Sequence, residues 1–393
     1  MTFQRKRVWA KESAAGPLNP SSIEAMRNIR TESIVRTAFS DRINARIFNH
    51  GTEKYVLAGD HSGFEYVLNR YMVHVPDAYF IPRDRFTMDR ATKSIIAPEM
   101  VSTESDPGLG GFGKTVEFLP DGRSVVDFTD CGTTIQGPVI CVSPWTSFSA
   151  RITQILMGIL HCDDLLEATL PILVPDDLTV LEQRGLALIG VGDDRLIKVP
   201  RDTAVRVIDA MVPSKSYARS MTLATNRGIL ELGYFLEPND LRALNRRIRA
   251  RLEPRAGQAP VLLLARADAG ARRITNELEV VDALERFGVR YIRTTETPLE
   301  ATCQAVMDAR VVVSGHGSGL MNFIAAGSAT PLIEIDHAGN DWLGRAICRV
   351  LGNKYRLASR PDAASRDFTD YTDRAADVGE IVAMVAEELG EHP

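Results

Sequence analysis

The feature that most constrains the fold is a glycine-rich loop between two short apolar segments, within residues 310–336. Residues 311–313 are three valines, a β-branched run that predicts a buried strand, and residues 331–335 predict the next strand. The loop, residues 314–319, is followed by an apolar segment, residues 320–326, that predicts a short helix. A strand, a glycine-rich turn, a helix start and a second strand are typical of a parallel α/β sheet.

The same loop is a candidate ligand site. Gly315, Gly317 and Gly319 let a ligand approach the backbone, and the amides at a helix start attract an anion. Their G-x-G-x-G spacing differs from the dinucleotide pattern G-x-G-x-x-G, so the glycines alone are also compatible with an ordinary tight turn. His316 follows a predicted parallel strand, where open α/β sheets bind ligands. A phosphate or a diphosphate is the simplest ligand that this loop predicts.

Size and charge indicate a globular protein of two to three domains. The chain has 393 residues, of which 45% are apolar and 25% are charged. Its 46 basic and 51 acidic residues give a net charge of −5, and no basic run is interleaved with aromatic residues. This balance argues against a nucleic-acid partner. No apolar run is long enough to predict a membrane span, which leaves peripheral membrane association open.

The cysteines and the amino terminus indicate a cytoplasmic protein. The five cysteines, at positions 131, 141, 162, 303 and 348, form no C-x-x-C pair and predict reduced core thiols. The basic residues 1–13 lack the apolar core of a secretion signal. The group His-Cys-Asp-Asp at 161–164 has no second ligand cluster, so it predicts a polar helix end and no metal site.

Alternating patterns predict an α/β fold in three parts. Residues 1–130 predict a partly irregular, mainly β region, with strands at 55–58 and 71–75 and turns at 76–77 and 106–108. Residues 131–250 predict strands at 137–143, 171–175 and 195–199 and helices at 149–162, 178–188, 203–211 and 238–252. Residues 251–393 predict strands at 261–264, 290–293, 311–313 and 331–335 and helices after Asn276, after Thr297, at 341–351 and at 375–389.

The two later parts predict a pair of Rossmann-like, doubly wound domains that face a cleft, with ligands at the carboxyl ends of the strands. Asn276 is expected to cap its helix with Glu279, and Thr297 and Glu300 to form a capping box around Pro298.

Charged residues gather in the first loop of the last part. Arg266, Arg272 and Arg273 suit bidentate phosphate contacts, and Asn276 begins the helix that follows them. Glu334 ends a strand at the same predicted edge, where a carboxylate can accept hydrogen bonds from ribose. Surface charges and a salt-bridge partner are the alternative interpretations of these residues.

Three segments carry a resemblance to a known family. R-A-D-A-G-A-R-R-I-T-N-E (266–277), S-G-H-G-S-G-L-M-N (314–322) and P-L-I-E-I-D (331–336) resemble motifs of glycosyltransferase family 61. The following D-W-L-G-R-A-I-C-R-V-L-G-N-K-Y-R (341–356) is similar to the helix and strand that close family members. The resemblance covers about residues 260–357 well, residues 137–200 more weakly, and the first hundred residues not at all.

The resemblance implies a GT-B architecture and an inverting, metal-independent transfer from a nucleotide sugar, commonly a UDP-sugar, to a saccharide or glycoconjugate, as in capsular polysaccharide synthesis. It implies a diphosphate contact by Arg266, Arg273 and Asn276, and a position near the ribose for Glu334. The residues that would line the donor pocket are Gly315, His316, Gly317, Ser318, Gly319 and Asn322.

One departure concerns the catalytic base that an inverting transfer requires. Family members carry a His and an Asp on the first helix of the amino-terminal half, and the matching residues 143–156 contain neither. The alternative bases in this sequence are His61, Glu65, His161, Asp163, Asp164 and His316. Three functions remain open: a glycosyltransferase, a nucleotide-sugar-binding subunit without turnover, and a sugar-nucleotide epimerase of GT-B type. The donor sugar, the acceptor and the oligomeric state are not specified by any motif.

Overall fold

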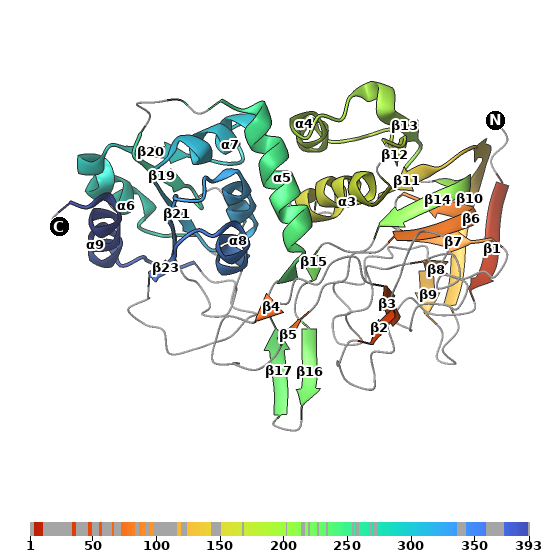
Figure 1. Cartoon of the computed structure of the whole chain (residues 1–393), viewed down its shortest axis with the longest axis horizontal. Helices are drawn as coiled ribbons and strands as arrows, with labels where there is room; N and C mark the ends of the chain where they lie inside the picture. Colours follow the sequence, from red (N-terminus) through yellow and green to blue (C-terminus); the bar gives the residue numbers. More distant parts are fainter. Residues whose placement is uncertain are drawn as a thin grey trace. The chain divides into compact units, whose positions relative to one another are not determined.

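The structure is a computed structural model of residues 1–393 (Figure 1). The residues that it describes, to which all statements below refer, are 4–10, 34–36, 46–48, 55–56, 65–66, 72–82, 86–90, 95–96, 116–118, 124–142, 151–166, 169–201, 203–213, 217–218, 221–225, 228–232, 235–253, 255, 259–267, 269–270, 273–335, 343–358 and 373–391.

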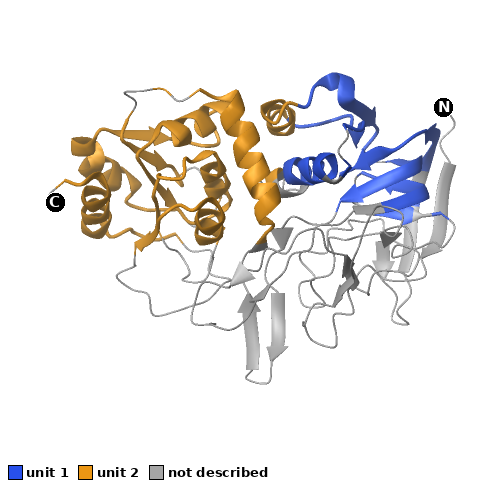
Figure 2. Ribbon diagram, in the orientation of Figure 1, with its two compact units in different colours: residues 1–146, 153–179, 191–232 blue, residues 147–152, 180–190, 233–393 orange. Residues whose placement is uncertain are grey.

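Contacts divide the chain into two compact units (Figure 2). Unit 1 comprises residues 1–146, 153–179 and 191–232, and unit 2 comprises residues 147–152, 180–190 and 233–393. Each unit has a hydrophobic core of its own. The domain boundaries that the sequence predicts near residues 130 and 250 stay predictions.

Every described element before residue 142 is a strand, in agreement with the predicted β region. These strands are β1 (Gln4–Ala10), β2 (Ile34–Arg36), β3 (Arg46–Phe48), β4 (Tyr55–Val56), β5 (Glu65–Tyr66), β6 (Met72–Ile81), β7 (Phe86–Asp89), β8 (Ile95–Ile96), β9 (Val116–Phe118), β10 (Ser124–Ile135) and β11 (Val139–Cys141). The predicted turn at 106–108 lies outside the described residues.

The turn predicted at residues 76–77 is wrong, because β6 continues through both residues. β6 pairs antiparallel with β14 (Thr203–Pro213), and the pairing passes from Asp77 to Val75 without a partner for Pro76. Proline has no N–H to donate to a neighbouring strand. Asp209, across from this gap, has a positive φ of 62°. The proline therefore interrupts the pairing of these strands locally without ending β6.

The remaining elements of unit 1 alternate as predicted up to residue 199. They are the end of the π-helical turn η2 (Arg151–Leu156), then α3 (Met157–Leu166), β12 (Ile172–Pro175), the 3₁₀ turn η3 (Asp193–Arg195) and β13 (Leu196–Val199). Short strands follow β14 at β15 (Tyr217–Ala218), β16 (Met221–Thr225) and β17 (Gly228–Leu232).

The helix predicted at 203–211 is wrong, because these residues form the strand β14. Apolar residues at 204, 205, 207, 208, 210 and 211 satisfy a helical spacing and a strand spacing equally well. β14 lies within the mixed sheet β13-β12-β11-β14-β6-β7-β8, parallel to β10 and β11 and antiparallel to β6. Buried sheet partners on both sides therefore override the local pattern.

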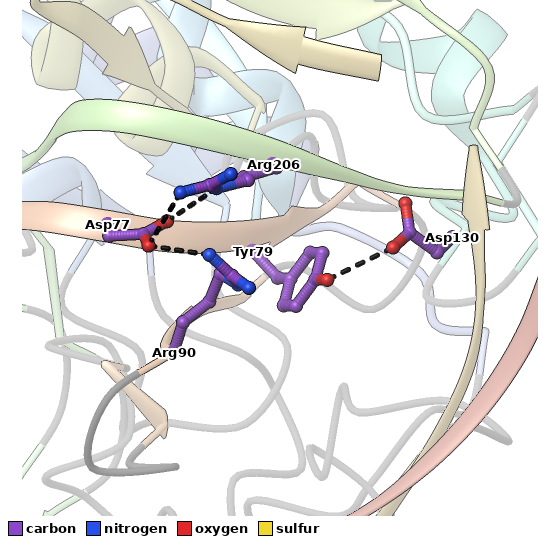
Figure 3. Close-up of polar contacts among 5 residues, drawn as sticks. All are labelled: Asp77, Tyr79, Arg90, Asp130 and Arg206. Atoms are coloured by element: carbon purple, nitrogen blue, oxygen red, sulfur yellow. Dashed lines mark hydrogen bonds and ion pairs between the residues drawn. The ribbon is translucent and has the colours of Figure 1, made fainter. Parts of the chain in front are cut away.

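A polar network ties together four strands of this sheet (Figure 3). Asp77 on β6 accepts two hydrogen bonds from Arg206 on β14, at 2.9 and 3.0 Å, and one from Arg90 after β7, at 2.6 Å. Tyr79 donates a 3.0 Å hydrogen bond to the buried Asp130 on β10. Burial raises the pKa of Asp77, but the hydrogen bonds and charges of both arginines outweigh it, so the pKa lies below its ordinary value.

The elements predicted in the last part of the chain are present in unit 2, with small shifts at their ends. The strands are β18 (Phe235–Leu236), β19 (Val261–Leu264), β20 (Val289–Ile292), β21 (Val311–Gly315), β22 (Leu332–Ile335) and β23 (Tyr355–Ala358). The helices are α4 (Val180–Leu188), α5 (Pro238–Arg251), α6 (Glu277–Leu284), η4 (Glu285–Phe287), α7 (Leu299–Asp308), η5 (Ser318–Ala325), α8 (Leu343–Leu351) and α9 (Val378–Leu389).

Unit 2 contains a doubly wound parallel sheet, as predicted. Its strand order is β20-β19-β21-β22-β23, and all neighbouring strands are parallel. One face, with Val261, Val313 and Ile333, packs on α6 and α9, where Val280 and Ile381 are buried. The helices α5, α7 and α8 pack against η5 and cover the other face (Figure 1). Such an order reverses direction between β19 and β21, the place where ligands bind in open α/β sheets.

Two predicted helix caps are wrong in detail. Asn276 occupies the N-cap position of α6 without capping it, because its side chain bonds the backbone N–H and C=O of Ala376 instead. The helix after Thr297 begins at Leu299 with Pro298 at the N-cap, so no capping box forms. For α6 the helix start is correct, and the polar side chain bonds a residue 100 positions later in the chain. None of the helices described is long and apolar enough to cross a bilayer.

Candidate functional site

Unit 2 contains a cavity of about 910 Å³ at the carboxyl edge of its parallel sheet. This volume lies within the range of small-molecule sites, roughly 300–1,000 Å³. The lining residues come from α4, from the loops after β19, β20 and β21, and from the starts of α7 and η5: Val180, Leu181, Arg184, Leu264, Ala265, Arg266, Ala269, Gly270, Thr294, Thr295, Glu296, Thr297, Pro298, Leu299, Thr302, Ser314, Ser318, Gly319 and Asn322.

The cavity lies at the predicted edge of the sheet and between the two predicted loops. Leu264 at the end of β19 pairs with Ser314 near the end of β21, so the loops after these strands leave the sheet side by side. Both loops contribute to the lining, through Arg266 and through Ser318 and Gly319. The structure therefore brings together the first arginine and the glycine-rich turn at the switch point of the sheet.

The side chain of Arg266 lies close along the glycine-rich turn, because the glycines there have no side chains that would exclude it. A Cβ on Gly315 would lie 2.5 Å from Cγ of Arg266, and a Cβ on Gly317 would lie 2.7 Å from its Nη1. Gly317 also has φ +145° and ψ −175°, a conformation that is essentially restricted to glycine. The turn thus needs glycine for its own backbone and for the approach of the guanidinium.

The loop that carries Arg266 is held by the buried Glu277. Its carboxylate accepts the backbone N–H of Arg266 at 2.6 Å and that of Ala267 at 2.8 Å. Tyr291 on β20 donates a third hydrogen bond to it, at 3.0 Å. Burial and the adjacent Glu277 raise the pKa of Tyr291. Sequence reasoning missed Glu277, although it ends the segment 266–277 that carries the family resemblance.

His316 and Glu334 form a buried pair beside the cavity. Nδ1 of His316 lies 2.7 Å from Oε1 of Glu334, and both side chains are at most 2% exposed. Tyr355 on β23 donates a 3.1 Å hydrogen bond to the other carboxylate oxygen. Neither His316 nor Glu334 is among the lining residues. The pair fixes the turn that follows β21 against the strands β22 and β23. The predicted catalytic and ribose contacts would depend on this positioning.

The start of η5 supplies polar groups to the cavity. Ser318, Gly319 and Asn322 line it together with Ser314. Asn322 is buried and donates a 2.9 Å hydrogen bond to the carbonyl of Gly319, which shapes the first turn of η5. These groups are where the sequence places the donor pocket.

The other predicted diphosphate contacts lie elsewhere in unit 2. Arg273 is 54% exposed, and two of its guanidinium nitrogens donate to Oδ2 of Asp373, at 2.6 and 2.8 Å. Asn276 bonds the backbone of Ala376, as described above. Neither residue lines the cavity, so their donor contacts stay predictions; Arg272 lies outside the described residues.

The predicted acceptor-side bases belong to unit 1. Asp163 on α3 is engaged by both terminal nitrogens of Arg195, whose Nε donates to the carbonyl of Leu170 at 2.7 Å. His161 on the same helix is fully buried. His61 lies outside the described residues, and of Glu65 only the backbone is described. The catalytic assignments of His61, Asp163 and His316 stay predictions.

Charges in the cavity favour an anion. The ionisable lining residues are Arg184, Arg266 and Glu296, and Glu296 pairs with Arg293 at 3.3 Å.

Among the described residues, no group of three or more His, Cys, Asp or Glu side chains has the arrangement of a metal site. Burial raises the pKa of Cys303 to about 12, with a smaller effect of Glu300, so this thiol stays protonated.

Sequence reasoning predicted the helix α4 but did not assign it, or the threonines after β20, to the cavity. Arg184 lies about 80 residues before Arg266 in the chain, and only the tertiary fold brings their helix and loop to one cavity. Thr294, Thr295 and Thr297 follow β20 and add hydroxyl groups to the same edge. Their position after a predicted strand was the available signal.

The doubly wound parallel sheet makes unit 2 a Rossmann-like α/β unit, and its cavity lies at the switch point where such sheets bind ligands. The family model Glycosyltransferase 61 matches residues 152–333, which include the glycine-rich turn and every residue that lines the cavity. Over these residues the match confirms the resemblance to glycosyltransferase family 61. The matched family is one of glycosyltransferases, enzymes that act on a donor and an acceptor. No curated protein matches the chain.

Proposed function

We propose that this protein is an inverting, metal-independent glycosyltransferase that binds a nucleotide sugar, a UDP-sugar, in the cavity of unit 2. The observation that carries the proposal is the position of Arg266, held along Gly315 and Gly317 at the edge of that cavity. A guanidinium beside a glycine-rich turn and a helix start, at the switch point of a parallel sheet, suits the diphosphate of a nucleotide sugar.

The same geometry suits the chemistry of the transfer. When the bond between the sugar and the diphosphate breaks, the leaving diphosphate gains negative charge, and a fixed guanidinium stabilises that charge without reorganising. Arg266 is fixed by Glu277 through its backbone and by the two glycines along its side chain. His316 and Glu334 hold the turn that forms the other wall.

The acceptor side of the proposal concerns unit 1. In a GT-B architecture, unit 1 supplies the acceptor site and the base that deprotonates the acceptor hydroxyl. His61 and Asp163 are the candidate bases in unit 1, and Asp163 would first have to leave Arg195. The acceptor is a saccharide or glycoconjugate of a surface or capsular polysaccharide, and the enzyme is cytoplasmic with peripheral access to the membrane.

The missing His and Asp in residues 143–156 favour a second candidate, a subunit that binds a nucleotide sugar without transferring it. A GT-B-type epimerase is the third. Incubation with a donor alone separates them: an epimerase converts the donor, a binding subunit leaves it intact, and a transferase yields product only with an acceptor. Retention of the anomeric configuration in the product would contradict the inverting mechanism, and loss of turnover in EDTA would contradict metal independence.

The donor site is tested by calorimetric titration of UDP and a panel of nucleotide sugars into the wild type and Arg266→Gln. Loss of a charge-assisted contact costs about 1.5–3 kcal/mol, so we expect an affinity about 10- to 100-fold lower. Arg290→Gln is the matched control, because Arg290 is exposed on β20 and does not line the cavity. Equal affinities for the two variants, or no binding of any nucleotide to the wild type, would refute the proposed site.

A further inference from the structure

We propose that Arg184 is a second diphosphate-binding residue of the cavity, which rests against Glu300 and turns to the ligand when it binds. This inference rests on the proposed function, because it names a further contact for the ligand of the same site. It concerns α4, a helix that no sequence motif connected with the donor.

α4 belongs to the cavity although its neighbours in the chain do not. Residues 180–190 belong to unit 2, whereas the flanking segments 153–179 and 191–232 belong to unit 1. α4 packs on α7, and Val180, Leu181 and Arg184 line the cavity together with Leu299 from the start of α7. The exposed, apolar Val180 and the cation Arg184 thus face a space that a ligand would fill.

Arg184 is weakly held in this structure. Its Nη1 lies 3.7 Å from Oε1 of Glu300, beyond hydrogen-bond distance, and the two side chains are 40% and 45% exposed. Two other arginines of the chain, Arg195 and Arg206, each hydrogen-bond both oxygens of a carboxylate. A loose, exposed ion pair is easily exchanged for a stronger partner.

The charge of a diphosphate supplies that partner. Arg266 and Arg184 are the two cations among the described lining residues, and the one carboxylate, Glu296, is paired with Arg293. One guanidinium can bind two oxygens in a bidentate manner, whereas a diphosphate presents oxygens on two phosphorus atoms. A second guanidinium from α4 would therefore complete the neutralisation that Arg266 begins.

Glu300 is placed to control Arg184 without touching the ligand. It lies in the first turn of α7 and is not among the lining residues. Its Oε2 is buried and accepts no hydrogen bond from any residue that the structure describes. Glu300→Gln therefore removes the charge that attracts Arg184 and leaves the described cavity wall intact. If the two states compete, this change strengthens diphosphate binding.

The test is calorimetric titration of the full chain with UDP, inorganic pyrophosphate and uridine at one ionic strength. We expect Arg184→Gln to weaken UDP and pyrophosphate binding about tenfold, as for loss of one charge-assisted contact, and to leave uridine within about twofold. Glu300→Gln should strengthen both anions by about twofold or more, and only when Arg184 is present. Arg184→Lys keeps the charge without the planar fork and should fall between wild type and Arg184→Gln.

Arg290→Gln, which makes the same change of net charge outside the cavity, is the control for long-range electrostatics. Unchanged melting temperatures of the unliganded variants show that they are folded. The inference is overturned if Arg184→Gln binds UDP like Arg290→Gln, or if Glu300→Gln acts equally in the Arg184→Gln background. If UDP then still binds and Arg266→Gln abolishes that binding, the proposed function is supported and only the role of Arg184 is refuted. If the wild type binds neither UDP nor pyrophosphate, both proposals fail.

Discussion

At the scale of single residues, Gly317 decides where the guanidinium of the cavity lies. Its backbone has φ +145°, and its missing Cβ leaves space that Arg266 occupies. The two constraints can be separated, because Gly352 after α8 also has a positive φ, of 79°, and has no atom within 4 Å of its Cβ position. Gly352 is required by its backbone conformation alone, whereas Gly317 is also required by the close approach of Arg266.

We predict that Gly317→Ala lowers the free energy of unfolding by about 1–3 kcal/mol and weakens UDP binding about tenfold or more. The alanine methyl group would lie 2.7 Å from Nη1 of Arg266, so the guanidinium must move. Gly352→Ala should cost about 1–2 kcal/mol of stability and leave UDP affinity unchanged. Urea unfolding and calorimetry measure the two effects. Similar UDP affinities for both variants would show that Arg266 does not depend on Gly317.

Residue types predicted the cavity better than they predicted its contacts. The glycines and Arg266 could be found because a strand, a glycine-rich turn and an arginine after the neighbouring strand all belong to one sheet edge. Arg273 and Asn276 look equivalent to Arg266 in the sequence, yet their partners are Asp373 and Ala376, 100 residues later. Sequence spacing gives no sign of a partner that distant, and a surface arginine and a phosphate-binding arginine have the same local pattern.

At the scale of elements, Asp77 links three segments of the unit 1 sheet through Arg206 and Arg90. The pKa of Asp77 in the folded protein is below its ordinary value of 3.8, so at acidic pH the unfolded chain binds this proton first. The contribution of Asp77 to stability is therefore present above about pH 3.8 and is lost as the pH falls through the folded pKa.

We predict that Asp77→Asn lowers the free energy of unfolding at neutral pH by about 1 kcal/mol, a low value because the network is partly exposed. The difference from the wild type should begin to shrink near pH 3.8, where Asp77 becomes protonated in the unfolded chain, and should be lost as the pH falls through the lower pKa of the folded state. Urea unfolding between about pH 3 and pH 7 measures it. Asp193→Asn, at a carboxylate that is 87% exposed, is the control and should show no such trend. A constant difference across this range would contradict the prediction.

The elements themselves were largely predictable, with one informative failure. In unit 2 the β-branched runs and the helix stops determine strands and helices locally, and Gly288 ends η4 in the left-handed conformation as expected. In β14 the local pattern fits a helix and a strand alike, and the decision comes from β6, β10 and β11 on either side. Mixed sheets depend on long-range pairing of this kind, which a single sequence does not reveal.

At the scale of the whole molecule, the division into two units separates ligand binding from much of the chain. Every residue that lines the cavity belongs to unit 2. This includes the lining residues of segment 180–190, which lies in the sequence between two segments of unit 1. A ligand of this cavity therefore stabilises the folded state of unit 2 directly. Unit 1 has a core of its own, built on β6, β11 and β14.

We predict two thermal transitions in calorimetry, of which UDP raises only the one that belongs to unit 2. At about 100 times its Kd, a ligand that binds only the folded state adds about 2.7 kcal/mol, which is enough to shift a melting temperature by several degrees. Hydrogen exchange assigns the transitions, since protection by UDP should increase in β19, β21 and α4 and stay unchanged in β6 and β14. Arg266→Gln should abolish the shift and leave the transition of unit 1 in place. Equal UDP-induced shifts of both transitions would mean that the nucleotide contacts both units, and the donor site would then have to extend beyond the cavity described.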